Sequence, residues 1–326
     1  MKALSAWFAA SAALVAVAGP AAAQSQIRFA HMNGAQHPVH LGALKLKEAV
    51  ERRTDKKVTV DVFPGGQLGE NTAVGEQISL GSAMIGQIGN GVLADYVPDF
   101  SVLVYPFLFK DWAQARTFLT GPLVKSMEKK IEANNIKVLC YINFGTRDLY
   151  TRAKPVRTPA DTAGLKLRVQ PVAIYTEMVK SMGATPTPMP WPEVYSALSQ
   201  GVIDAAEAPP NAIIDQKQYE HAKFYMKTNH IVDVSPIAMS LAAYNRLSPE
   251  HRKVVDEESQ ASCDYISDET SKGYAASVQV LKDRGMTIIE DVDRAAFAKR
   301  AEDVQKAFPK WSPNLLAQVK AAVGPN

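Results

Sequence analysis

The sequence predicts an α/β protein with a largely parallel sheet, built as two successive units. Segments with the two-residue alternation of strands are interleaved with segments that have helical spacing, and this order restarts after Gly145. The length of 326 residues also favours two domains over one. A third observation is the stretch 248–285, in which Gly273 is the one residue that weakens a helix.

The first unit begins with a short apolar strand over 26–30. Apolar residues then recur every three or four positions over 39–50, which predicts a helix. Valines alternate with other residues over 58–63, and a Pro-Gly-Gly turn ends that strand. The same reasoning predicts a helix over 70–80, a strand over 83–88, a helix over 111–134 and a strand over 138–143.

The second unit repeats this order. A Thr-Pro pair at 158–159 is typical of a helix start, and Pro171 ends a strand over 165–169. A helix over 173–182, a strand over 185–189, a helix from Trp191 and a strand over 202–206 follow.

The stretch 248–285 is unusually long for a single helix of a globular domain. As one continuous helix it would be about 57 Å long, whereas a domain of about 100 residues has a radius of gyration of only about 13 Å. Such a helix should therefore lie across two lobes. The alternative is a break at Gly273 that gives two ordinary helices.

Composition and charge exclude several classes. The chain is 47% hydrophobic and 21% charged, which is globular, and its 36 basic and 33 acidic residues form no basic stripe of the kind that nucleic-acid binding needs. Two cysteines, Cys140 and Cys263, make no disulfide scaffold and no CxxC pair. We expect two separately buried thiols, with a single bridge between them as the alternative.

Residues 1–23 have the pattern of a secretory signal peptide. Lys2 precedes an apolar run that is too short to span a membrane, and small residues precede Gln24. We therefore expect an exported mature chain, 24–326, in a bacterial periplasm.

Local catalytic and metal-binding signatures are absent from the sequence: it has no G-x-S-x-G elbow, H-E-x-x-H helix, Walker A loop or G-x-G-x-x-G fingerprint. His31, His37 and His40 lie close together and have the chemistry of metal ligands. We expect them instead to cap a helix or face solvent, and we predict no metal.

Two arginines follow predicted strands. Arg147 comes after 138–143, and Arg168 lies at the carboxyl end of 165–169. Ligands of open α/β sheets bind outside those ends, and a guanidinium matches a carboxylate with two donors. The pattern suggests an anion clamp, with two solvated or salt-bridged arginines as the alternative.

Three more side chains stand out near strand ends. Trp191 either stacks on a ligand or packs in the core. Glu207 lies among alanines and a proline, where a carboxylate needs a partner, and His230 is a candidate for that partner.

Ordered motifs then match a known family. They are FPGGQLG (63–69), PFLF (106–109), GLKLRV (164–169), GATPTPM (183–189), EVYSAL (193–198), GVID (201–204) and TNH (228–230). Over 26–310 the chain resembles the periplasmic solute-binding proteins of TRAP transporters, the DctP-type family.

The resemblance implies a two-lobed α/β periplasmic binding protein. Two mixed or mostly parallel sheets flanked by helices would enclose a hinged cleft, and 248–285 would be one long helix spanning both lobes. Lobe I would take 24–143 plus about 233–270, and lobe II 144–232 plus about 271–326. The protein would capture a small organic acid without catalysis or cofactor. As a monomer, it would deliver the acid to the small and large membrane subunits of a transporter driven by a sodium gradient.

The resemblance also assigns residues. Arg168 would be the principal carboxylate ligand and Arg147 a second basic residue, while Glu207 and His230 would support Arg168 and Trp191 would cover the ligand. Polar contacts from the first lobe would come from Asn33, Asn71 and Asn90.

One departure affects the site. Many members carry Asn directly after the glutamate, but here Ala208 follows Glu207, so Asn211 or water would have to substitute. A subgroup that binds a cation has Trp at that position, and its absence argues against metal-assisted binding. A hydroxy acid or sugar acid is favoured as ligand, although an aromatic acid would also use Trp191.

Two other classes of function remain as alternatives. An exported hydrolase or isomerase would use Glu207 and His230 for acid–base work. A sensor would present its bound ligand to a membrane receptor.

Overall fold

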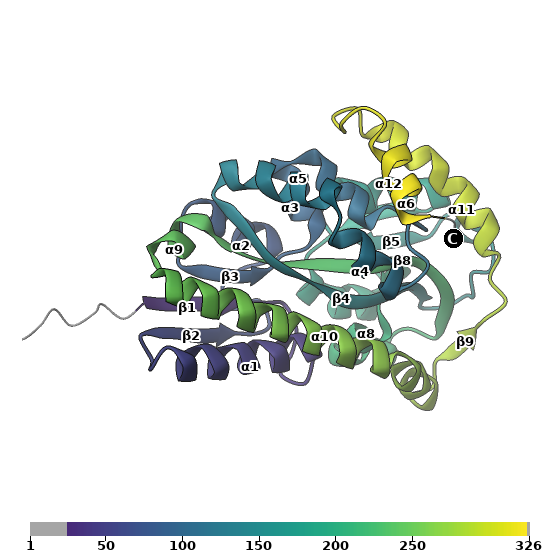
Figure 1. The fold of residues 1–326 in the computed structure, drawn as a ribbon. Helices are drawn as coiled ribbons and strands as arrows, with labels where there is room; N and C mark the ends of the chain where they lie inside the picture. The colour runs from purple at the N-terminus through teal and green to yellow at the C-terminus, as the bar shows by residue number, and fades with distance from the viewer. Residues whose placement is uncertain (1–24, 325–326) are drawn as a thin grey trace, which may run out of the picture.

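The computed structural model describes residues 25–324, so the predicted signal peptide lies outside the described residues. Strands β1 (Ser25–Ala30), β2 (Val58–Phe63) and β3 (Met84–Gln87) form a parallel group. Helices α1 (Pro38–Arg53) and α2 (Asn71–Ser79) connect them, as the alternation predicts, and α3 (Asn90–Tyr96), which was not predicted, follows β3. In Figure 1, α2 and α3 lie on the opposite side of this sheet from α1.

Two long antiparallel strands carry the chain between the halves of the molecule. They are β4 (Ile136–Thr151) and β8 (Phe224–Ser240), and they pair from one end to the other. The strand order is β2-β1-β3-β8-β4-β7-β5-β6, with β9 (Thr287–Ile289) paired to β8. The two expected sheets are therefore joined into one, because β4 and β8 belong to both.

β4 also corrects a predicted boundary. The strand does not end at Asn143 but continues through Arg147, with register shifts between Asn143 and Gly145 and between Arg147 and Leu149. Gly145 has φ +128°, a conformation that side chains rarely adopt, and a Cβ there would lie 2.7 Å from Pro209. The bulge thus brings the middle of β4 against the segment that follows β7.

The second half repeats the α/β order. β5 (Lys166–Val169) pairs in parallel with β6 (Thr185–Pro188) and β7 (Ala205–Ala208), and β7 pairs antiparallel with β4. Helices α6 (Ala173–Met182), α7 (Val194–Gln200) and α8 (Pro210–Asp215) accompany them. β7 begins at Ala205 rather than at residue 202, and Pro159–Thr162 forms only a 3-10 turn.

The helix expected over 111–134 is two helices. α4 (Trp112–Leu119) ends before Gly121, and α5 (Pro122–Ile131) begins at a proline, which cannot continue a preceding helix. A 3-10 turn, Glu132–Asn134, follows α5. The last helices, α11 (Arg294–Ala301) and α12 (Leu315–Val323), come after β9, and α12 packs on α4.

One helix runs along both halves. After the short α9 (Leu241–Arg246), α10 (Pro249–Asp283) is continuous for 35 residues, about 53 Å. Ser248 caps it by accepting the N–H of His251, and no atom would meet a Cβ at Gly273. It packs on α1, β4 and α8 (Figure 1), which confirms the continuous helix. The lobe boundaries themselves remain a prediction.

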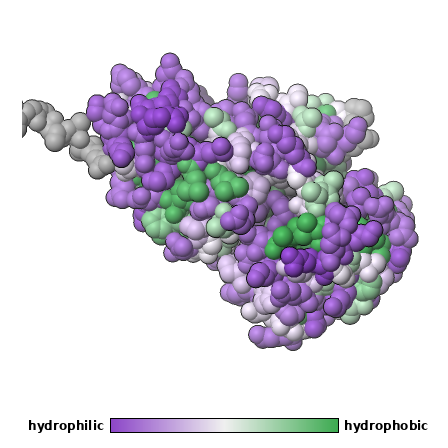
Figure 2. Space-filling view, turned by 90° about the horizontal axis from the view of Figure 1, so that it is seen from below, coloured by the Kyte–Doolittle hydropathy of each residue, from purple (hydrophilic) through white to green (hydrophobic). Residues whose placement is uncertain are grey.

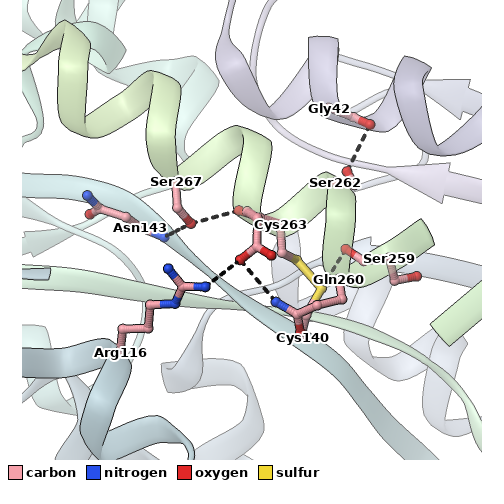
Figure 3. The surroundings of a disulfide bond; sticks show 10 residues. Gly42, Arg116, Cys140, Asn143, Ser259, Gln260, Ser262, Cys263 and Ser267 are labelled. Carbon is pink, nitrogen blue, oxygen red and sulfur yellow. Dashed lines mark hydrogen bonds and ion pairs between the residues drawn. A yellow bond between two sulfur atoms is a disulfide. The ribbon is translucent and has the colours of Figure 1, made fainter. Parts of the chain in front are cut away.

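A disulfide joins α10 to β4. Cys140 and Cys263 are bonded, with their Cα atoms 6.4 Å apart, so the expectation of two separate thiols is wrong. The two residues are 123 positions apart in the chain, and only the packing of α10 on β4 brings them together. Figure 3 shows neighbouring hydrogen bonds on the same helix, from the backbone N–H of Asn143 to Ser267 and from Ser262 to the carbonyl of Gly42.

One face of the molecule is mostly hydrophilic, with separate hydrophobic patches (Figure 2). Large exposed hydrophobic residues among those described are Leu44, Leu80, Val202 and Val280. No helix within 25–324 has the length and apolar character needed to cross a membrane.

Candidate ligand-binding cleft

A cavity lies between the two halves, at the carboxyl ends of the parallel strands. It contains about 840 Å³ of empty space, including the part open to solvent. Residues that follow β1 and β3 form one wall, and residues of β4 and those that follow β5 and β7 form the other. The lining includes Asn33, Glu70, Asn71, Gln87, Arg147, Arg168, Tyr175, Trp191, Ala208, Asp233 and Ser235.

Arg168 is buried in this cavity with one donor left over. Its Nε and Nη2 donate to the carbonyl of Met189 at 3.1 and 2.8 Å, and its Nη1 has no hydrogen-bond partner among the described residues. The guanidinium lies over the ring of Trp191, 5.2 Å from the centroid. Burial lowers the pKa of Arg168 to about 10, so the side chain stays charged at neutral pH. A buried cation with an unpaired donor needs an anionic partner.

Arg147 is also buried, but it has two carboxylate partners. Its Nη2 donates to Glu207 Oε1 at 2.7 Å and to the Glu207 carbonyl at 2.9 Å, and its Nε pairs with Glu207 Oε2. Its Nη1 donates to Asp233 Oδ2 at 2.7 Å. Burial opposes the charge, but the negative charges around the guanidinium, Glu207 first, outweigh that effect and raise the pKa of Arg147 well above its ordinary value.

Glu207 and His230 therefore support a different arginine from the one expected. His230 Nε2 lies 3.4 Å from Glu207 Oε2, while its Nδ1 lies 2.8 Å from Thr228 Oγ1. Burial raises the pKa of Glu207, but Arg147 overrides this and holds it at about 2. The direct bonds of Glu207 go to Arg147 and not to Arg168.

The sheet register explains this correction. β4 and β7 are antiparallel, and Glu207 lies opposite Leu149. Arg147 is two residues from Leu149, so its side chain emerges on the same face and reaches Glu207 diagonally. Arg168 acts on Glu207 only through its charge.

The four asparagines occupy different places. Asn33 and Asn71 line the cavity, and Asn33 Nδ2 donates to Gln87 Oε1 at 3.3 Å. Asn90 does not line it, because its Nδ2 donates to the carbonyl of Val234. Asn211 faces a second cavity beside α10 and lies 3.2 Å from His37, so it does not replace the amide missing at Ala208.

The halves touch each other across the cleft. The backbone N–H of Gly34 donates to Asp215 Oδ2 at 2.8 Å, next to the contact between His37 and Asn211. A Cβ on Gly91 would lie 2.6 Å from Val172 Cγ1. These contacts join the two halves beside Arg168 and Arg147, whose residues are 1% and 2% exposed.

The expectation for the histidines holds for His37, which caps a helix, but not for His31, which is buried rather than exposed to solvent. His37 caps α1 by accepting the N–H of Val39 at 3.2 Å, and His31 Nε2 lies 3.1 Å from His40 Nδ1. Burial is the main reason why the pKa of His31 falls to about 4 and that of His37 to about 3. No group of three metal-ligating side chains occurs within the part of the chain that the structure describes.

Sequence reasoning missed several lining residues. Gln87, Tyr175 and Asp233 all face the cavity, and the guanidinium of Arg147 lies 5.2 Å from the ring centroid of Tyr175. Asp233 stands between two valines in a long apolar run, and a lone carboxylate in that setting is the signal that would have revealed it.

Comparisons with known proteins agree with this architecture. A family model described as "Bacterial extracellular solute-binding protein, family 7" matches residues 29–310. The 2,3-diketo-L-gulonate-binding periplasmic protein YiaO of Escherichia coli (strain K12) is 30% identical over 311 residues, which is 95% of each chain. A TRAP periplasmic solute-binding protein from Ochrobacterium anthropi with bound L-fuconate has a TM-score of 0.88 and 33% identity, covering 93% of this chain and 100% of its own. One from Actinobacillus succinogenes with bound L-galactonate has a TM-score of 0.88 and 30% identity, covering 92% and 99%.

Proposed function

This chain belongs to family 7 of the bacterial extracellular solute-binding proteins, and we propose that it binds a sugar acid or a related hydroxy acid in the cleft for a TRAP transporter. The observation that carries the proposal is the buried Nη1 of Arg168, which has no partner among residues 25–324. The similar structures with bound L-fuconate and L-galactonate support the choice of ligand class.

Arg168 is suited to receive the carboxylate. Two of its nitrogens are already fixed by the Met189 carbonyl, and Trp191 lies against its plane. Little side-chain freedom is therefore left to lose when an acid docks. Beside Arg168, Arg147 is held in place by two ion pairs, one with Glu207 and one with Asp233.

Polar side chains further along the cavity suit the hydroxylated remainder of the ligand. Asn33, Asn71 and Gln87 offer amides, and Ser235 accepts from Gln87 Nε2 at 2.8 Å. Such side chains can form hydrogen bonds with ligand hydroxyls, which a simple fatty acid lacks.

A binding role fits the cleft better than catalysis. Glu207, the residue of the catalytic alternative, bonds to Arg147 and remains ionised down to its pKa of about 2. A carboxylate held in this way is a poor proton donor or acceptor near neutral pH. Delivery from the periplasm to small and large membrane subunits, driven by a sodium gradient, and a monomeric state complete the proposal.

Thermal unfolding of the mature chain tests the proposal. The protein is unfolded, dialysed and refolded to remove carried-over ligand, and is then screened against aldonic, uronic, aromatic and dicarboxylic acids and neutral sugars. Ligand at 100 times its dissociation constant stabilises by about 2.7 kcal/mol, so the right acid should raise the midpoint by several degrees. The same acid should leave Arg168→Gln unmoved. A flat screen, or equal shifts with neutral sugars, would contradict the proposal.

A further inference from the structure

We infer that Asp233 determines which acids the cleft accepts, by selecting ligands with a single carboxylate and a nearby hydroxyl over dicarboxylic acids. This inference rests on the proposed function and deepens it. It assigns a specificity role to a residue of β8 that sequence analysis did not single out.

The Asp233 carboxylate is held by the protein at one of its two oxygens. Its side chain is 8% exposed, and Oδ2 accepts from Arg147 Nη1 at 2.7 Å. Oδ1 has no hydrogen bond within the described residues, and Asp233 is part of the cavity lining. One carboxylate oxygen is thus fixed on the protein, while the other is available to a ligand.

The two arginines of the cavity differ in whether a protein carboxylate contacts them. Arg147 touches two carboxylates, those of Glu207 and Asp233, whereas Arg168 touches none and bonds only to the Met189 carbonyl. The cavity therefore offers one cation that no protein carboxylate contacts. Because Asp233 occupies Arg147, a second ligand carboxylate has no guanidinium of its own.

A second ligand carboxylate would lie near negatively charged side chains of the cavity. The cavity is lined by two carboxylates, Asp233 and Glu70. Like charges brought together in a desolvated site repel strongly, since water no longer screens them. This repulsion would weaken the binding of a dicarboxylic acid, but not that of a monocarboxylic acid with a neutral far end.

Asp233 Oδ1 is an acceptor without a hydrogen-bond partner among the described residues, and it is not one of the fully buried polar atoms. A ligand that covers it without supplying a donor would leave it unsatisfied, which is unfavourable. A ligand hydroxyl donates to such an acceptor, and a site built around that bond rejects an analogue without it. Asp233 would therefore raise the affinity for a hydroxylated acid and lower the affinity for a dicarboxylate.

Matched ligands give a direct test. Galactonate and galactarate share a carbon chain and four hydroxyls and differ only at the last carbon, which is a CH2OH group in one and a carboxylate in the other. Gluconate and glucarate form a second pair. Isothermal titration should show the wild-type protein binding the monocarboxylate at least about tenfold more tightly than its dicarboxylate partner. Asp233→Asn should reduce that ratio by about tenfold or more.

Two other variants locate the effect. Asp99→Asn removes a different buried carboxylate, which pairs with Lys130 away from the cavity, and should leave the ratio unchanged. Glu70→Gln should change the ratio less than Asp233→Asn does.

The outcomes separate this inference from the proposed function. Equal wild-type affinity for the two members of a pair overturns it, even if every variant fails to fold. A ratio that is unchanged in Asp233→Asn, or that moves only in Glu70→Gln, also overturns it while the proposed function stands. If no acid binds the wild-type protein, the proposed function fails and the inference fails with it.

Discussion

Exchanging each buried arginine for glutamine should separate ligand binding from stability. Arg168 lines the cavity and has an unpaired donor, whereas Arg147 holds two buried carboxylates. Arg168→Gln should therefore weaken acid binding and leave the fold nearly as stable as before. Arg147→Gln should destabilise the fold directly.

The expected magnitudes follow from these contacts. A ligand carboxylate would accept one charge-assisted hydrogen bond from the unpaired Nη1 of Arg168, worth about 1.5–3 kcal/mol. Its loss raises the dissociation constant by about one to two orders of magnitude. Arg147→Gln leaves Glu207 and Asp233 buried without a cation, which typically costs about 3–5 kcal/mol of stability.

Isothermal titration with the acid found in the screen measures the first effect, and urea unfolding without ligand measures the second. Arg157→Gln is the matched control, because Arg157 pairs with Asp291 on the surface and should change neither quantity. The reasoning is refuted if Arg168→Gln retains the wild-type affinity to within about threefold. It is equally refuted if Arg147→Gln unfolds at the wild-type urea concentration.

Three further predictions test the frame around the site. Replacing Cys140 and Cys263 by serine removes a link across 123 residues (Figure 3) and should lower the free energy of unfolding by about 2–5 kcal/mol; a reductant should lower the wild-type midpoint in urea similarly and leave the variant unmoved. Gly91→Ala should weaken acid binding and keep the liganded protein open in small-angle scattering, because its Cβ would lie 2.6 Å from Val172, and adding Val172→Ala should restore closure. Lastly, the pKa values of His31 and His37 are lowered on folding to about 4 and about 3, so their contribution to stability is complete above pH 6.5 and is lost as the pH falls towards those values. Urea unfolding between pH 7 and pH 5 should show this decline, by up to about 1.4 kcal/mol per pH unit for each histidine, and a flat profile would contradict it.

Local pattern was enough to predict much of the fold. The elements over 58–63 and 173–182 have the predicted bounds, because each ends at a turn or glycine that the sequence displays. The local sequence also predicted helix over the residues of α10, and the family resemblance favoured one continuous helix over a break at Gly273.

The features that sequence reasoning missed depend on contacts between distant segments. β8 is buried almost throughout and shows no two-residue alternation, so its 17 residues gave no clear strand signal. The disulfide and the joined sheet likewise depend on how α10, β4 and β8 pack, which a single sequence does not display.

In the binding site, too, some features follow from the local sequence and others depend on contacts between distant segments. The position of Arg168 near a strand end was readable, but that of Arg147 was not, because β4 continues past it to Thr151. The partner of Glu207 was not readable either, because it depends on the antiparallel register of β4 with β7. That register gives the two arginines different roles. Arg147 is neutralised as the protein folds, through strands that run between the two halves, whereas Arg168 keeps an unpaired donor in the finished fold. Arg147 is thus paired within the protein, and Arg168 is left to pair with the ligand. The affinity for an acid then comes from a single charge that is already oriented before the ligand binds.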